Sequence, residues 1–375
     1  MWSMLQHAKQ ASCGFARRHK KLLIVTSVGV ACTGGAYYVY RRILSEAESF
    51  TQEIQEQMAE HQRLKLALGS TADESRATVR RFLPRIKTRL YLLLDLESVV
   101  KQLKMLDNTQ KNERNALWED AKLLAFTRYI TALVAFGLWH LLVFSQVSII
   151  GKRVFEISKR KGQRVAMEEQ AHHAFLSSGL EYFLDNALSK IKNHVETVVK
   201  MNDQLQAWKV SRKAAVKEDE LNQLLQALFI AVLPSPAAVA AAERHEDLTE
   251  LSMWREFVIY PEKQKGQDEH VISLLNDLWD LLESDLFMPA LQQSLSFLCG
   301  NAFQDFSDVV YRSENNLEEK PVPPLAKLIP SLQAEASKLL LSSGPDSYAA
   351  KYSLGMGEME AFRSFYETIF FEQSR

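Results

Sequence analysis

The sequence predicts an all-α protein, a helical bundle preceded by one N-terminal transmembrane helix. Glycine and proline are scarce, with 14 and 10 among 375 residues, and both all-β and βαβ folds need many more tight turns. Long segments also space their apolar residues in threes and fours, the period of an amphipathic helix. Because 47% of the residues are apolar, such a chain can bury a sizeable core.

Charge is distributed unevenly along the chain. The whole sequence has 45 basic and 46 acidic residues, a net charge of −1. Residues 1–45 hold seven basic residues and no acidic one, which leaves 38 basic and 46 acidic residues, a net of −8, in the other 330. A basic end joined to an acidic body is typical of a chain with a membrane- or nucleic-acid-directed terminus.

The basic end contains a membrane-anchor pattern. Residues 22–40 carry no charge, and a helix of that length spans about 30 Å, the hydrocarbon thickness of a bilayer. Basic side chains flank this run on both sides: Arg17, Arg18, Lys20, Lys21, Arg41 and Arg42. We expect a short basic segment at 1–21, a retained anchor that contacts membrane lipid at 22–40, and a helical-bundle domain at 41–375. A cleaved signal peptide is the alternative, but the second basic flank resembles a stop-transfer signal.

The order of charges bears on topology. Taken alone, the positive-inside rule would place the more basic N-terminal flank in the cytoplasm. The four residues of that flank, Arg17, Arg18, Lys20 and Lys21, are the ones that we expect to direct the chain to its membrane.

The body is expected to be helical from one end to the other. Asp107–Thr109 breaks the apolar pattern, residues 233–236 with the alanine run after them predict a linker, and residues 313–324 predict a loop. The expected helices are 43–68, 73–106, 115–161, 168–200, 203–232, 246–260, 268–300 and 325–342.

Residues 129–150 invite two interpretations. The run contains no Asp, Glu, Lys or Arg, so a hydropathy scan would score it as a second transmembrane helix. On a helical wheel, however, the polar residues in and around it fall mostly within one half. They are Arg128, Thr131, Ser145, Gln146, Ser148 and Lys152. We favour a helix buried in the bundle core and keep a second membrane span as the alternative.

Motifs for catalysis or cofactor binding are absent from the sequence. There is no phosphate-binding glycine loop and no H-E-x-x-H zinc motif, and His172 and His173 point about 100° apart on a helix. Cys13, Cys32 and Cys299 are too scattered for a disulfide framework or a zinc site and indicate a reducing environment. We therefore expect no enzyme activity, no metal, no cofactor and no nucleic-acid partner.

One stretch does indicate binding. Trp118, Ala121, Lys122 and Ala125 share one helix face at i, i+3, i+4 and i+7. An aromatic residue with small and cationic neighbours is typical of a groove that accepts a partner's amphipathic helix. The alternative is a tryptophan that covers the end of the bundle core.

Several blocks of sequence occur in the order found in the peroxin-3 family (peroxisomal biogenesis factor 3), which the chain resembles. The quoted blocks are Arg18-His19-Lys20-Lys21 before a single apolar span, Phe82-Leu83-Pro84, Trp118-Glu119-Asp120-x-Lys122, Phe126-Thr127-Arg128, Gln146-Val147-Ser148-Ile149-Ile150-Gly151, Leu274-Leu275-Asn276, Leu282-Glu283-Ser284 and Leu325-Ala326-Lys327-Leu328-Ile329-Pro330. The resemblance covers most of the chain and is tight only in these blocks.

The resemblance implies a single-pass peroxisomal membrane protein with its N-terminus in the lumen. Its domain in the cytosol would be an elongated and twisted helical bundle. It implies that a groove at the membrane-distal end binds the N-terminal amphipathic helix of peroxin-19, the chaperone and import receptor for peroxisomal membrane proteins. A membrane-anchored helical tether or scaffold that does not bind this chaperone is the alternative function.

The resemblance also implies roles for particular residues. Trp118 would be the aromatic anchor of the groove, and Lys122 and Arg114 would be charged residues at its rim. Lys327, Ile329 and, as an apolar wall, Leu103 would line it. Ala121 stands where the family has a bulkier leucine, which implies a shallower groove.

Overall fold

The computed structural model of the protein describes residues 33–106, 110–159, 165–244, 249–259, 268–312, 320–341, 344 and 346–371. All secondary-structure elements in these ranges are helices, so the all-α prediction is confirmed. The chain divides into two compact units, Met1–Leu66 and Ala67–Arg375, and this division falls inside the first described helix. The elements are α2 (Thr33–Leu93), α3 (Leu96–Met105), α4 (Lys111–Lys159), α5 (Val165–Tyr182), η1 (Phe183–Ala187), α6 (Leu188–Met201), α7 (Asp203–Ala207), α8 (Glu218–Val232), α9 (Pro236–Glu243), α10 (Thr249–Glu256), α11 (Glu269–Glu283), α12 (Phe287–Tyr311), α13 (Leu325–Leu339), α14 (Tyr348–Glu358) and α15 (Glu360–Phe371).

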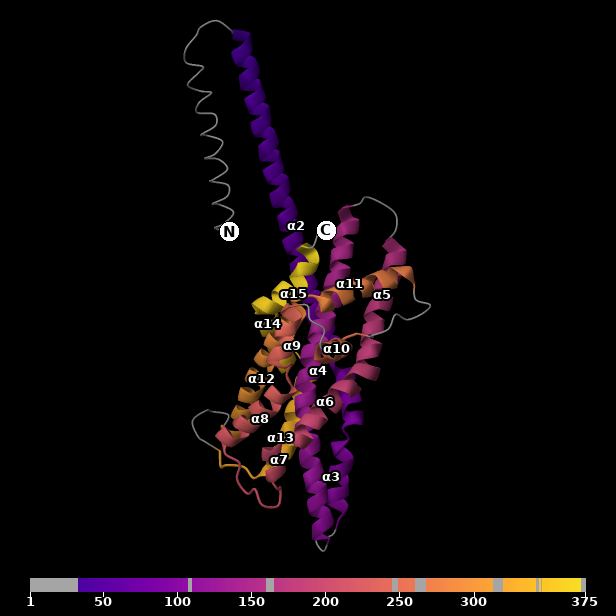
Figure 1. Ribbon diagram of the computed structural model, residues 1–375, viewed down its shortest axis with the longest axis vertical. Helices are drawn as coiled ribbons and strands as arrows, with labels where there is room; N and C mark the ends of the chain where they lie inside the picture. The colour runs from indigo at the N-terminus through magenta and orange to yellow at the C-terminus, as the bar shows by residue number, and fades with distance from the viewer. Residues whose placement is uncertain are drawn as a thin grey trace. The chain divides into compact units, whose positions relative to one another are not determined.

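α4 is the central helix of the second unit. α3, α6, α12, α13 and α15 all pack against it (Figure 1). The most apolar window of α4 is 94% buried inside the protein. Residues 129–149 are buried without exception, so the interpretation of the 129–150 run as a core helix is confirmed.

Two buried polar side chains of α4, Ser145 and Gln146, have hydrogen-bond partners inside the bundle. Ser145 donates a hydrogen bond to the carbonyl oxygen of Leu141 at 2.8 Å, and the Gln146 amide donates to that of Phe175 at 2.8 Å. Buried polar groups are tolerated when they are hydrogen-bonded in this way. Ser145 and Gln146 can therefore lie inside the bundle without facing water.

α2 corrects the expected positions of the first helix boundaries. The helices expected at 43–68 and 73–106 form one helix through Leu93, with Pro84 inside it. The break comes instead at Leu94 and Asp95, where the Asp95 carboxylate accepts a hydrogen bond from the Ser98 amide at 2.9 Å and caps α3. An N-terminal aspartate cap of this kind is a strong helix-start signal.

The C-terminal half also departs from the expected boundaries. The alanine run after Pro236 is helix α9 and not a linker, because the Ser235 side chain caps it and proline is favourable at the first helical position. The single helix expected at 268–300 is wrong, since α11 ends at Glu283 and α12 begins at Phe287. α7 and α8 likewise replace one helix expected at 203–232, and α14 and α15 were not expected.

Two stretches of the described residues have the length and hydropathy to cross a membrane. They are Lys111–Ile157, which contains the buried window of α4, and Glu218–Glu243, whose window is 44% buried. The segment expected at 1–21 lies outside the described residues. So do residues 22–32 of the expected anchor, while residues 33–40 form the start of α2.

Candidate partner-binding site

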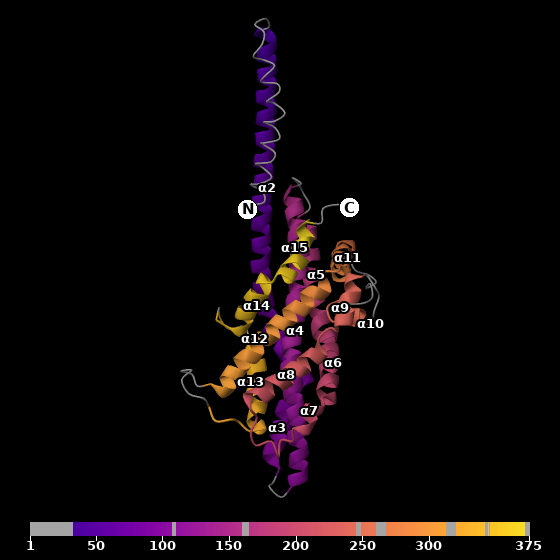
Figure 2. The ribbon, with the colours of Figure 1, turned by 60° about the vertical axis from the view of Figure 1, so that its left-hand side comes forward.

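α3, α7 and the beginnings of α4 and α13 gather at one end of the second unit, and α15 lies at the other (Figures 1 and 2). This end contains all seven residues that the sequence assigned to a binding groove. They are Leu103 on α3, Arg114, Trp118, Ala121 and Lys122 on α4, and Lys327 and Ile329 on α13. Both α3 and α13 pack against α4, so three neighbouring helices carry the candidate site.

Trp118 is half-buried on the third turn of α4. Ala121 and Ala125, on the same face, are fully buried. Small side chains at these positions allow neighbouring backbone to approach α4 closely, and they leave the larger indole ring nearer to the surface. Trp118 is thus partly accessible to solvent, as a residue that anchors a partner must be.

Lys122 corrects the expectation of an exposed cation at a rim. Its side chain is buried. The ammonium lies 2.7 Å from the Glu119 carboxylate and donates to the carbonyl oxygens of Leu205 at 3.0 Å and Trp208 at 2.7 Å. A lysine charge can remain buried only when it is paired and hydrogen-bonded in this way.

The other predicted residues differ in accessibility. Lys327 is exposed, and Arg114 is half-buried with an electrostatic or hydrogen-bond partner. Leu103 and Ile329 are buried. Among the seven, therefore, Trp118, Arg114 and Lys327 offer surface to a partner, and the remaining four shape the packing beneath them.

The structure adds the 203–216 segment, which the sequence did not assign to the site. It consists of α7 and the turn that follows. Glu119 Oε1 accepts a hydrogen bond from the Val210 amide at 2.8 Å, and the Lys213 ammonium lies 5.1 Å from the centroid of the Trp208 ring. The sequence signal here is Trp208 among polar residues, near the start of the helix expected at 203–232.

The same segment is joined to α13. The Val216 amide donates to the Pro323 carbonyl oxygen at 2.9 Å, and the Leu325 amide donates to that of Lys213 at 3.1 Å. The 203–216 segment therefore connects the Trp118 region of α4 to the start of α13, where Lys327 lies.

Electrostatics at this end centre on Glu119. Burial alone would raise the pKa of the Glu119 carboxyl, but hydrogen bonds from Lys122 and Val210 outweigh it and place the pKa below the ordinary value of 4.5. Glu119 is thus ionised at neutral pH and balances the buried ammonium of Lys122.

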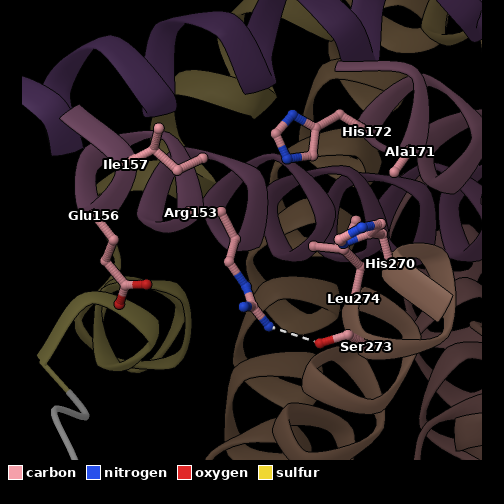
Figure 3. Close-up of a pocket in the computed structure, with 8 residues that line it drawn as sticks. All are labelled: Arg153, Glu156, Ile157, Ala171, His172, His270, Ser273 and Leu274. Carbon is pink, nitrogen blue, oxygen red and sulfur yellow. Dashed lines mark hydrogen bonds between the residues drawn. The ribbon is translucent and has the colours of Figure 1, made fainter. Parts of the chain in front are cut away.

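A separate pocket of about 120 Å³ lies between α4, α5 and α11 (Figure 3). Arg153 donates to the Ser273 hydroxyl at 2.9 Å and pairs with Asp277 at 2.6 Å. The residues that line the pocket are Arg153, Glu156, Ile157, Ala171, His172, His270, Ser273 and Leu274. Among the described residues, no group of three His, Cys, Asp or Glu side chains is placed to hold a metal ion.

Fold and candidate site together define the class: an all-α helical-bundle protein with a half-buried tryptophan at one end. The chain is 26% identical over 341 residues to peroxisomal biogenesis factor 3 of Cricetulus longicaudatus, covering 86% of this chain and 87% of that protein. The factor of the same name from Homo sapiens is 25% identical over 341 residues, with the same coverage. Peroxisome biogenesis protein 3-2 of Arabidopsis thaliana is 24% identical over 216 residues, which is 50% of this chain and 56% of that protein.

No family model matches the chain. The curated proteins nevertheless show that it has homologues named peroxisomal biogenesis factor 3 in several species, so the resemblance inferred from the sequence blocks is confirmed. These homologues support a peroxisome biogenesis membrane protein and imply a peroxisomal location.

Proposed function

We propose that this protein is a docking receptor of the peroxisomal membrane that binds the N-terminal amphipathic helix of peroxin-19. The binding surface lies at the end of the bundle formed by α3, α4 and α13. The observation that carries the proposal is Trp118, a half-buried indole above fully buried alanines on the central helix. The homology to peroxisomal biogenesis factor 3 proteins supports the same assignment.

Docking works by burial of apolar surface at one central residue. An amphipathic helix laid against Trp118 would remove the exposed part of the indole from water, and each Å² of apolar area buried contributes about 25 cal/mol. Lys327 is exposed on α13 and would contact the polar edge of the incoming helix. Ala121 and Ile329 support the surface from below.

The proposal includes the membrane topology. Residues 22–40 span the membrane, residues 1–21 face the lumen, and the helical domain lies in the cytosol, where it meets a soluble chaperone. The basic residues 17, 18, 20 and 21 assist targeting. The role of the chain is to dock peroxin-19 at the membrane for membrane protein insertion during peroxisome biogenesis, with no catalytic step.

Binding of a peroxin-19 N-terminal peptide to the full-length protein in detergent micelles tests this function. Trp118→Ala is expected to weaken the affinity by about 2 kcal/mol, or roughly 30-fold, as truncation of a central aromatic residue does. Phe371→Ala is the matched control, because Phe371 is an exposed aromatic residue on α15, at the other end of the bundle.

Two results would count against the proposal. If Trp118→Ala binds the peptide as tightly as the unaltered protein, Trp118 is not the anchor. If the full-length protein does not bind the peptide at all but does retain a cytoskeletal or membrane partner, the tether function replaces the docking function.

A further inference from the structure

We propose that Lys122 is a positioning residue that fixes the 203–216 segment beside Trp118, and that this segment supplies the cationic edge of the docking surface through Lys209 and Arg212. The inference rests on the proposed function and deepens it. It moves the cationic role from Lys122, which is buried, to side chains that Lys122 holds in place.

The first step is the geometry of α4. Residues four apart on a helix lie one above the other on the same face, so Lys122 lies one turn beyond Trp118 on the same side. The ammonium of Lys122 contacts the carbonyl oxygens of Leu205 and Trp208 at 3.0 Å and 2.7 Å. The backbone of the 203–216 segment therefore runs along the side of α4 that carries Trp118.

The second step is the reason why the segment needs a cation. α7 has only five residues and ends at Ala207, and the last carbonyl groups of a helix have no partner within the helix. Lys122 donates to the carbonyl oxygen of Trp208, the residue after the helix, and to that of Leu205, which also accepts from the Trp208 amide at 3.2 Å. A cation is also favoured there by the helix dipole. Without the ammonium, the two carbonyl oxygens would lose these buried hydrogen bonds, at a cost that favours separation of the segment from α4.

The third step is that the contact is fixed from both sides. Glu119 pairs with the Lys122 ammonium and also accepts the Val210 amide hydrogen bond. Beyond Val210, the segment is hydrogen-bonded to the start of α13 through Lys213 and Val216. Lys122 thus sets the position of a strip of backbone that reaches from α4 to α13.

The fourth step concerns what this strip presents to a partner. Lys209 and Arg212 are exposed, and Lys327 is exposed on α13 next to the same strip. Lys209 lies 3.9 Å from the Glu119 carboxylate and keeps half of its side chain in solvent. A helix that buries its apolar face on Trp118 would therefore meet positive charge along one edge, and we infer that the matching edge of the partner helix is acidic.

The experiment combines peptide binding with backbone hydrogen exchange on the full-length protein in detergent micelles. The variants are Lys122→Met, the pair Lys209→Met with Arg212→Met, and Trp118→Ala. Lys200→Met is the control, because Lys200 is an exposed lysine of α6 that pairs with Glu196 at 2.5 Å. Binding of the peroxin-19 N-terminal peptide is measured at low and at high salt.

Three results are expected together. In the absence of peptide, Lys122→Met accelerates amide exchange in residues 205–216 by about tenfold or more, since it removes buried hydrogen bonds. It also weakens peptide binding by about tenfold. The Lys209 and Arg212 pair leaves exchange unchanged, but weakens binding at low salt and flattens its salt dependence, because exposed charges are screened by salt.

Each contrary result has a definite meaning. Weaker binding of Lys122→Met with unchanged exchange would show that Lys122 contacts the partner directly, which overturns the inference. Unchanged affinity and salt dependence of the Lys209 and Arg212 pair would overturn the cationic edge.

If Lys122→Met does not fold, Glu119→Gln replaces it, since glutamine keeps an acceptor for Val210 but removes the charge that balances Lys122. Glu119→Gln is then expected to accelerate exchange in residues 205–216, and unchanged exchange would overturn the positioning role.

The proposed function fails in a distinguishable way. If the unaltered protein does not bind the peptide, or if Trp118→Ala has no effect, the docking function itself is wrong. If Trp118→Ala weakens binding and the two charge variants do not, only the inference about Lys122 and the 203–216 segment fails.

Discussion

Arg128 of α4 and Glu97 of α3 form a two-point ion pair, with nitrogen–oxygen distances of 2.8 Å and 2.7 Å. The guanidinium is fully buried, also donates to the Leu94 carbonyl oxygen, and stacks 4.0 Å from the centroid of the Tyr91 ring. Glu97 accepts a further hydrogen bond from the Gln333 amide at 2.7 Å. This pair ties together α3, α4 and α13, the three helices that carry the candidate site.

Glu97→Gln is expected to destabilise the protein at neutral pH and to have less effect in acid. Hydrogen bonds to a charged group contribute about 1.5–3 kcal/mol, and partial exposure of Glu97 reduces this to about 1 kcal/mol because solvent screens the pair. Burial raises the pKa of Glu97, but hydrogen bonds from Arg128 outweigh it and place the pKa below the ordinary 4.5.

The sign of this pH dependence follows from the lowered pKa. A carboxyl whose pKa is lower in the folded state stabilises the fold above its unfolded pKa and ceases to do so as the pH falls through the folded value. Urea denaturation of both proteins at pH 7 and below pH 4.5 measures the difference. A difference that stays the same at both pH values would contradict this prediction.

His140 is expected to destabilise the protein as the pH falls below 6.5. Burial, with a smaller contribution from Arg76, lowers its pKa from 6.5 to about 3. The ring stacks on Phe144 and shares a hydrogen bond of 2.8 Å with the Ser353 hydroxyl. Between these two pKa values the unfolded chain binds a proton that the folded protein excludes, so stability rises with pH in this window.

The size of the His140 effect can be tested with His140→Phe. From pH 7 to pH 5, a group with an unfolded pKa of 6.5 and a much lower folded pKa removes about 2 kcal/mol of the free energy of unfolding. Denaturation at both pH values should give a smaller loss for His140→Phe by about this amount. Equal losses in the two proteins would show that His140 does not titrate differently on unfolding.

Two glycines in helices form a matched pair for testing close packing. At Gly179 in α5, an added Cβ would lie 2.4 Å from Nε2 and 2.9 Å from Cδ of Gln146, whose buried amide is hydrogen-bonded to Phe175. Gly179→Ala is therefore expected to destabilise by about 1–3 kcal/mol, the usual effect of overpacking.

Gly300 in α12 has no atom within 4 Å of an added Cβ. Gly300→Ala is expected to stabilise the protein by up to about 1 kcal/mol, since alanine has the higher helix propensity. Thermal unfolding of the two variants measures the contrast. An unchanged stability of Gly179→Ala would mean that contact with Gln146 does not limit the side chain at residue 179. Destabilisation by Gly300→Ala would contradict the open surroundings of residue 300.

A fragment of residues 43–375 is expected to stay soluble and helical without detergent. In α4, 94% of the most apolar window is buried within the protein, so after removal of the predicted 22–40 anchor this long apolar helix is covered by other helices and needs no lipid. Sedimentation and circular dichroism of the fragment check this. A fragment that remains in solution only with detergent would favour the second membrane span.

The individual elements show where sequence reasoning succeeded and where it did not. The lack of glycine and proline and the helical spacing of apolar residues predicted the class, because both are local properties of the chain. Boundaries were less accurate: α2 continues past Gly69, where the sequence predicted a break, since Thr71 and Ala72 are buried. Packing against other helices outweighs a local preference of about 1 kcal/mol.

For the candidate site, the sequence likewise predicted the local features but not the contacts between distant segments. Spacing on a helix identified Trp118, Ala121 and Lys122 as neighbours on one face, and the structure places them so. It could not predict that Lys122 is buried, because the acceptors that hold its ammonium come from residues 205 and 208. Nothing in the local sequence around Lys122 reports contacts formed more than eighty residues away.

By itself, the sequence determined that this chain is all-α, that its charge separates a basic start from an acidic body, and that it resembles peroxisomal biogenesis factor 3. Each of these depends on composition, period or order along the chain. Only the tertiary structure decided that the 129–150 run is a buried core helix and that Lys122 lies inside the bundle. Burial is a property of what packs around a residue, and the free energy of a lysine or an apolar helix changes with those neighbours.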